Sequence, residues 1–193
     1  MRLVCGIGIC DISTRTDNKS DREYVLWKGV LERCYSERIL SKHPTYRGCF
    51  MSEDWLTYSN FKADIQRMRN FEMEGFQLDK DILIKGNKLY SKNTCCFLPR
   101  DINTLVINRK LHRGEYPVGV RSRNDGGSNP FEASCSMNGR RHYLGSYESA
   151  YEAFLVYKRF KEDAVKAKAN HYKDILGIGI YNALMNWSIE IDD

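Results

Sequence analysis

The sequence predicts an α+β protein built from two modules. Residues 76–110 read as strand, loop, strand and helix, and three short segments within residues 117–144 alternate polar and apolar side chains with the period of a strand. Apolar residues recur at helical spacing on either side of these segments. We expect four segments in order: a ββα module with flanking helices at 1–107, a basic linker at 108–116, a three-stranded antiparallel sheet plus helix at 117–171, and a helix with an acidic tail at 172–193.

The first module is expected to open with a strand at 1–10, which is too short an apolar run for a signal peptide and lacks a cleavage site. Two helices follow, one at about 21–38 and one that begins near Ser52. Their apolar stripes are Tyr24, Trp27, Leu31 and Cys34 in the first, and Trp55, Tyr58, Phe61, Ile65 and Met68 in the second.

The centre of the first module is predicted to be a ββα unit. Residues 76–84 read as a strand, 85–88 as a turn and 94–98 as a second strand. Pro99 is placed at the first position of the following helix, where proline is favoured.

The second module shows period-two alternation in three short segments. Arg121 and Arg123 lie opposite Val118, Val120 and Ser122, while Glu132, Ser134 and Ser136 lie opposite the apolar row of Phe131, Ala133, Cys135 and Met137. Asn138-Gly139 then predicts a tight hairpin turn before a third strand at 141–144. If the strands are in register, one basic surface consists of Arg121, Arg123, Ser134, Ser136, Arg141 and Tyr143.

A helix is predicted to cover the apolar side of this sheet. Ser149 precedes Glu152 by three residues, which is the spacing of a capping box. The apolar residues Ala153, Tyr157, Phe160 and Ala164 then recur at helical spacing. The alternative is an ordinary sheet-plus-helix unit whose charged outer face only meets solvent.

The segments 119–123, 131–135 and 141–153 resemble the plant ethylene-response-factor (Apetala-type) DNA-binding domain, which also occurs fused to nucleases in phages and mobile elements. The resemblance implies that the sheet enters the major groove of double-stranded DNA, with contacts from Arg121, Arg123, Arg141 and Tyr143. The chain departs from the family in the polar loop at 124–130, and in Ser134 and Ser136, where the family carries charge.

A basic run precedes the second module, and its charged residues are Arg109, Lys110 and Arg113. We expect these side chains to lie along DNA phosphates. The alternative is a solvated connector between the modules.

The ββα unit resembles the HNH superfamily of nucleases, and in particular its phage members. The matching residues are Leu78-Asp79, Gly86-Asn87-Lys88, Tyr90-Ser91, Phe97 and Ile102-Asn103. By position, the resemblance implies that Asp79 and Asn103 are metal ligands, and both offer the oxygen atoms that Mg²⁺ prefers.

The residue at the general-base position of this family is here Lys80. A lysine ammonium keeps its proton at neutral pH and cannot accept another, so the position predicts a degenerate nuclease centre. In an active centre Asp81 could serve as a weak substitute base, or the fold could bring His43 or His112 to this position.

A structural zinc site is the alternative metal site. Its ligands would be Cys34, His43, Cys49 and Cys95 or Cys96, although the spacing lacks any C-x-x-C pair. Buried free thiols are the other interpretation of the same residues.

The leading hypothesis is a site-specific DNA-binding protein of phage or mobile-element type, similar to a homing endonuclease with an inactive centre, which acts as a repressor or a competitor for a site. The alternatives are an active Mg²⁺-dependent HNH endonuclease or nickase, and a protein-binding inhibitor. The net charge of +5 is compatible with a nucleic-acid partner. Seven cysteines and the lack of a secretory signal predict a cytoplasmic location. No apolar run is long enough to cross a bilayer, so no membrane partner is expected. The predicted helix at 172–187 either packs back on the module or forms a homodimer.

Overall fold

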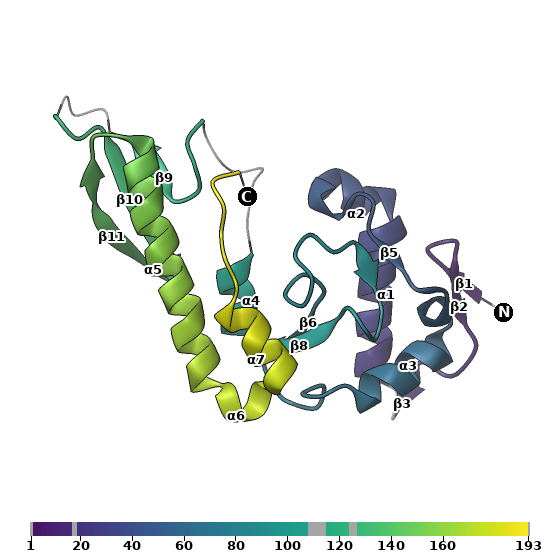
Figure 1. Ribbon diagram of the computed structural model, residues 1–193. Helices are drawn as coiled ribbons and strands as arrows, with labels where there is room; N and C mark the ends of the chain where they lie inside the picture. Colours follow the sequence, from purple (N-terminus) through teal and green to yellow (C-terminus); the bar gives the residue numbers. More distant parts are fainter. Residues whose placement is uncertain (1, 17–18, 108–114, 124–126, 193) are drawn as a thin grey trace. The chain divides into compact units, whose positions relative to one another are not determined.

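Residues 2–16, 19–107, 115–123 and 127–192 are described by the computed structural model. Helices and several small sheets follow one another along the chain (Figure 1), which confirms the predicted α+β class. Contacts divide the chain into two compact units, Met1–Leu98 and Pro99–Asp193. The division falls before the predicted linker at 108–116.

The first unit contains several two-stranded sheets. These pairs are β1 (Arg2–Val4) with β2 (Gly8–Cys10), β3 (Arg15–Thr16) with β4 (Lys19–Ser20), β5 (Phe50–Met51) with β7 (Leu89–Tyr90), and β6 (Phe76–Asp79) with β8 (Cys96–Pro99). Its helical segments are α1 (Arg22–Tyr35), α2 (Glu37–Lys42), the 3₁₀ turns η1 (Pro44–Tyr46) and η2 (Glu53–Leu56), and α3 (Tyr58–Arg67).

The core of the first unit is aromatic. Trp27, Trp55, Tyr58 and Phe61 are fully buried between α1, η2 and α3. The Trp27 Nε1–H group donates a hydrogen bond of 2.8 Å to the Trp55 carbonyl oxygen, so the largest side chain of α1 is tied to η2. The two predicted apolar stripes are therefore confirmed as core, with Tyr24 and Met68 packed at its edge.

Three predicted elements of the first unit are wrong in their extent. The predicted strand at 1–10 is a hairpin, because Cys5 and Gly6 take φ values of 51° and 76° and reverse the chain. The helix at 21–38 is interrupted at Ser36, whose backbone is extended. The segment after Ser52 forms a 3₁₀ turn, and α3 begins only after an extended Thr57.

The strands of the predicted ββα unit also differ. The predicted strand at 76–84 ends at Asp79, and the predicted strand at 94–98 lies instead at Cys96–Pro99. Pro99 is the last strand residue and immediately precedes α4 (Arg100–Val106), so it is not the first helical residue.

The second unit contains α4 and an antiparallel three-stranded sheet in the order β11-β10-β9. The strands are β9 (Val120–Ser122), β10 (Phe131–Met137) and β11 (Arg140–Tyr147). The helices that follow are α5 (Ala150–His171), α6 (Lys173–Leu176) and α7 (Ile178–Met185). Asp101 of α4 forms an ion pair with Lys168 of α5, which explains why α4 belongs to this unit.

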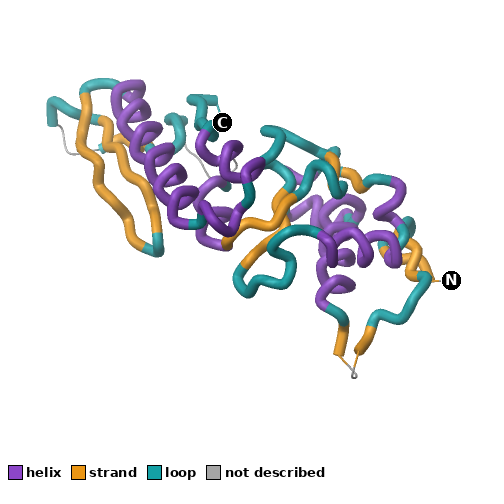
Figure 2. Tube along the Cα trace, turned by 60° about the horizontal axis from the view of Figure 1, so that its bottom comes forward, coloured by secondary structure: helices purple, strands orange, loops and turns teal. Residues whose placement is uncertain are grey.

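The long helix α5 runs alongside one face of the sheet, as Figures 1 and 2 show. Ala133 and Cys135 of β10 pack there against Ala153, Phe154 and Tyr157. The predicted turn at Asn138-Gly139 is confirmed, since both residues have positive φ (53° and 72°). The predicted capping box is confirmed too: the Glu152 backbone N–H donates to Ser149 Oγ at 3.2 Å.

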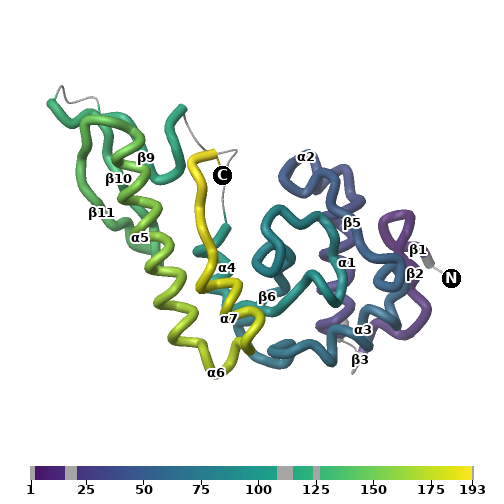
Figure 3. The backbone as a smooth tube through the Cα atoms, viewed as in Figure 1, coloured from purple at the N-terminus to yellow at the C-terminus, as the bar shows by residue number. Residues whose placement is uncertain are grey.

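Beyond α5 the chain turns through α6 into α7, a path that can be followed in Figure 3. The single helix predicted at 172–187 is wrong, because Gly177 has a φ of 77° and separates two short helices. Ile189 is fully buried in the core of the second unit, and Leu176 and Leu184 are fully buried as well. The predicted homodimer stays a prediction.

Candidate nucleic-acid interface

One face of the three-stranded sheet is polar, and the strand register assembles it. Glu132 lies between Arg121 of β9 and Ser146 of β11, and Ser134 lies opposite Tyr143. Residues directly opposite each other in an antiparallel sheet share a face, and Ala133 between them faces α5. We call this surface the sheet face, and it comprises Arg121, Arg123, Glu132, Ser134, Ser136, Arg141, Tyr143 and Ser146.

A β-bulge decides which residues of β11 join the sheet face. Ala133 pairs with Gly145 but Ser134 pairs with Tyr143, so Leu144 is the extra residue. Without the bulge, strict alternation from Ser146 would bring Leu144 to the polar side. With it, Tyr143 and Arg141 take the polar side and Leu144 packs against the core.

A buried carboxylate links the two edge strands. Glu132 accepts hydrogen bonds from Arg121 Nε at 3.1 Å and Arg121 Nη2 at 2.9 Å, and from Arg141 Nη2 at 2.9 Å. Arg141 Nη2 also donates to Ser134 Oγ at 2.9 Å. The Glu132 side chain is 9% exposed, whereas those of Arg121 and Arg141 are 56% and 47% exposed. The carboxylate therefore holds two guanidinium groups at the surface.

A second cluster on the sheet face centres on Ser146. Arg123 Nη1 donates to Ser146 Oγ at 2.5 Å, and the hydroxyls of Ser146 and Tyr143 are 2.9 Å apart. Tyr143 is 62% exposed. Three arginines outnumber the one glutamate, so the sheet face has a net positive charge and several hydroxyl donors.

The structure thus places all six predicted residues of the sheet on one face, away from α5. Sequence reasoning missed Glu132 and Ser146 as members of the site. The alternation of β10 already placed Glu132 on the same face as Ser134. A single acidic residue on a face rich in arginine could therefore have identified Glu132 as their partner. The linker residues Arg109, Lys110 and Arg113 lie outside the described residues.

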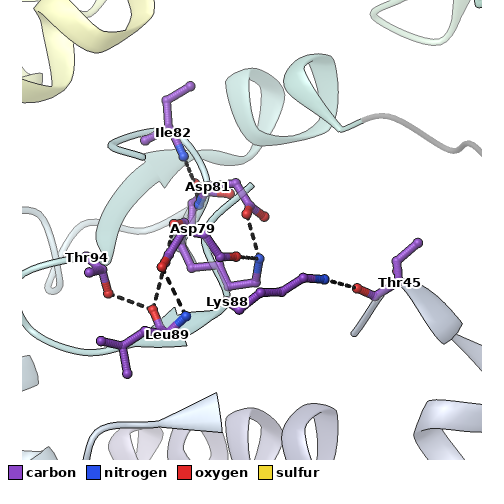
Figure 4. A network of polar contacts seen from close by, with 9 residues as sticks. Thr45, Asp79, Asp81, Ile82, Lys88, Leu89 and Thr94 are labelled. Atoms are coloured by element: carbon purple, nitrogen blue, oxygen red, sulfur yellow. Dashed lines mark hydrogen bonds and ion pairs between the residues drawn. The ribbon is translucent and has the colours of Figure 1, made fainter. Parts of the chain in front are cut away.

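In the first unit, Asp79 caps the turn that ends β6. Its Oδ1 accepts hydrogen bonds of 2.8 Å from the backbone N–H groups of both Asp81 and Ile82 (Figure 4). Burial raises the pKa of the Asp79 carboxyl, and these two hydrogen bonds act in the opposite direction. The carboxylate thereby ends the strand, which is why the predicted strand at 76–84 stops short.

Lys80 is buried and closes the following loop. Its Nζ donates to Asp81 Oδ1 and to the Asn87 carbonyl oxygen, each at 2.6 Å. The Asn87 side chain returns hydrogen bonds to the carbonyl oxygens of Lys80 (2.8 Å) and Leu89 (2.7 Å). Figure 4 also shows Thr94 bound to Leu89. The predicted catalytic residues Asp79, Lys80 and Asp81 therefore stabilise the conformation of the loop between β6 and β7.

The predicted Mg²⁺ ligands belong to different units, Asp79 to the first and Asn103, in α4, to the second. Over the described ranges of the chain, no group of three or more His, Cys, Asp or Glu side chains is arranged to hold a metal. The catalytic role of Asp79, Lys80 and Asp81 and the Mg²⁺ role of Asp79 and Asn103 stay predictions.

The cysteines proposed for zinc are buried thiols. Cys34, Cys49 and Cys95 lie in the core of the first unit and Cys96 is also buried, whereas His43 is exposed. Burial raises the pKa of both Cys34 and Cys95 to about 12. Buried thiols of this kind suit an apolar core, and the zinc site stays a prediction.

Replacing Lys80 with methionine is expected to lower the free energy of unfolding of the first unit by about 1–3 kcal/mol, because the loop loses a charged donor in a buried place. Urea unfolding followed by the fluorescence of Trp27 and Trp55 measures this, with Trp187→Phe as the background variant. Lys92→Met is the control, since that exposed ammonium only approaches Asp64 to 3.9 Å and should contribute less than about 0.5 kcal/mol. Equal effects of the two substitutions would contradict the assignment.

Iodoacetamide is expected to modify the partly buried Cys5 and Cys10 of the native protein well before the five buried thiols, Cys34, Cys49, Cys95, Cys96 and Cys135. Mass spectrometry of labelled peptides at pH 8 measures this, with urea-unfolded protein as the fully labelled control. Early labelling of Cys34 or Cys95 would contradict the packing.

Burial raises the folded pKa of the Cys34 thiol from 9.0 to about 12. The stability that this neutral thiol contributes is therefore complete below pH 9.0 and is lost as the pH rises toward 12.

Comparisons with protein-family models, with curated proteins and with solved structures give no match for this chain. Among the helices that the structure describes, none combines the length and the apolar character needed to cross a bilayer.

Proposed function

We propose that this chain is a site-specific protein for double-stranded DNA, and that it docks the sheet face of its second unit on the duplex. The observation that carries the proposal is the arrangement of Arg121 and Arg141, which project from the two edge strands and are held at the surface by Glu132. Arginines fixed on an exposed surface lose little further conformational freedom when they bind a partner.

The chemistry of the sheet face suits DNA. The planar fork of arginine matches both phosphate oxygens and the O6 and N7 atoms of guanine. The hydroxyls of Tyr143, Ser136 and Ser146 can donate to phosphates, which fixes the position of a protein on the duplex without reading its sequence. A narrow antiparallel sheet with its helix on the opposite side can enter the major groove.

The first unit supports a binding role rather than a cutting one. Lys80 is at the position that the HNH resemblance assigns to the general base, and its ammonium donates protons to Asp81 and Asn87, so it cannot accept a proton from water. We therefore propose a homing-endonuclease-like protein of phage or mobile-element type that binds its site without cleavage. Such a protein acts as a repressor or as a competitor for the site.

Selection of bound duplexes from a random DNA pool, with and without Mg²⁺, tests this proposal. We expect one enriched motif under both conditions, with intact DNA ends. The absence of any enriched motif would contradict the proposal, and so would affinity that does not fall with added salt. Cut ends that disappear in Asp79→Ala would instead support an active endonuclease.

A further inference from the structure

The five N–H groups of an arginine form two edges that can each offer a pair of hydrogens. The side edge consists of Nε–H and one Nη2 hydrogen. The terminal edge consists of one Nη1 hydrogen and the second Nη2 hydrogen. Bidentate recognition of guanine through O6 and N7 needs one complete edge, whereas a phosphate oxygen can accept a single hydrogen bond.

Arg121 keeps a complete edge in this structure. Glu132 binds its Nε at 3.1 Å and its Nη2 at 2.9 Å, which is the side edge. With respect to the parts of the chain that are described, these bonds leave the terminal edge of Arg121 open to an outside acceptor. The side chain is 56% exposed, so an acceptor can reach that edge.

Arg141 keeps neither edge complete. Its Nη2 donates to Glu132 Oε1 and to Ser134 Oγ, each at 2.9 Å, so both Nη2 hydrogens are engaged. Because Nη2 is shared by the side edge and the terminal edge, both edges lose one of their two hydrogens. The hydrogens that remain, on Nε and Nη1, can each donate a single bond but do not form a pair.

We infer that Glu132 is a positioning residue that gives the two arginines different tasks: Arg121 reads a guanine through its terminal edge, and Arg141 binds a phosphate. This inference depends on the proposed DNA-binding function and specifies it further. Glu132 does not itself contact DNA, because its carboxylate is covered by the two guanidinium groups. Its negative charge and two oxygens fix which edge of each arginine faces outward.

The test uses the full chain and the DNA motif that it selects. Arg121→Lys should lower the preference for one G·C pair of the motif roughly 10- to 100-fold, since an ammonium cannot make the bidentate contact. Arg141→Lys should leave that preference unchanged, because lysine also binds phosphate. Arg159→Lys, on the exposed side of α5, is the matched control.

Replacing the guanine of that pair by 7-deazaguanine removes the N7 acceptor and keeps O6. We expect this base to weaken binding by the wild type and by Arg141→Lys roughly tenfold. It should have little further effect on Arg121→Lys. Such non-additivity in a double-mutant cycle reports a direct contact between Arg121 and the base.

Glu132→Gln should reproduce the loss of guanine preference, because its amide group presents a donor to a guanidinium. Binding to unrelated DNA should be unchanged or tighter, since one negative charge is removed. A merely structural role for Glu132 would instead weaken binding to both DNAs equally. Glu148→Gln, an exposed acid outside the sheet face, is the control.

Two further outcomes separate the inference from the function on which it depends. If a motif is selected but Arg121→Lys keeps the full guanine preference, or Arg141→Lys removes it, the division of tasks is wrong and DNA binding stands. If the wild type selects no motif, the proposed function fails and the inference fails with it.

Discussion

Replacing Arg121 and Arg141 together with alanine is expected to weaken specific DNA binding by about 2–5 kcal/mol, because one base contact and one phosphate contact are removed from the centre of the sheet face. Binding to unrelated DNA should fall less, and the slope of log K against log salt concentration should decrease by about one, because one of the two lost contacts is to a phosphate. Titration of the selected duplex and of a scrambled duplex at several salt concentrations measures both quantities.

The double variant also leaves the Glu132 carboxylate buried without its two partners, which destabilises the sheet. The triple variant with Glu132→Ala removes that unpaired charge. We therefore expect the triple variant to recover much of the stability lost by the double variant, but none of its DNA affinity. Recovery of affinity together with stability would show that the arginines act only through folding.

Gly119→Ala is expected to destabilise the second unit by about 2–5 kcal/mol. Gly119 has a φ of 78°, which costs an L-residue about 1–2 kcal/mol. An added Cβ would also lie 2.1 Å from Cδ2 of Tyr157, so the contact between β9 and α5 would have to open, at about 1–3 kcal/mol. Faster amide hydrogen exchange in β10, measured by mass spectrometry, reports this loss.

Gly139→Ala separates the two causes. Gly139 has a similar φ of 72°, but an added Cβ there would meet nothing within 4 Å. We expect Gly139→Ala to lower the free energy of unfolding of the second unit by only about 1–2 kcal/mol, which is the cost of a positive φ for an L-residue. If the two alanine variants change hydrogen exchange in β10 equally, then the Tyr157 contact does not hold the sheet on the helix.

The features that the sequence predicted correctly are those that local chemistry decides. The apolar row of β10 follows from alternation, the turn follows from Asn138-Gly139, and the start of α5 follows from Ser149 and Glu152. Each of these signals acts within a few residues, so no knowledge of the rest of the fold is needed.

The features that sequence reasoning missed depend on distant partners. The bulge opposite Ala133 and Ser134 sets the face that Tyr143 presents, and it is defined only once β10 and β11 are paired. The role of Glu132 likewise requires arginines from two other strands. The unit boundary also shifts because α4 is tied to α5, which is far away along the sequence.

An NMR titration of the full chain with the selected DNA tests whether the sheet face contacts the duplex. We expect the side-chain Nε–H signals of Arg121 and Arg141 and the backbone signals of β9, β10 and β11 to shift with the duplex. Signals from the exposed side of α5, such as Arg159, should stay in place. Shifts confined to another surface, with the signals of Arg121 and Arg141 unchanged at saturation, would show that the duplex does not dock on the sheet face.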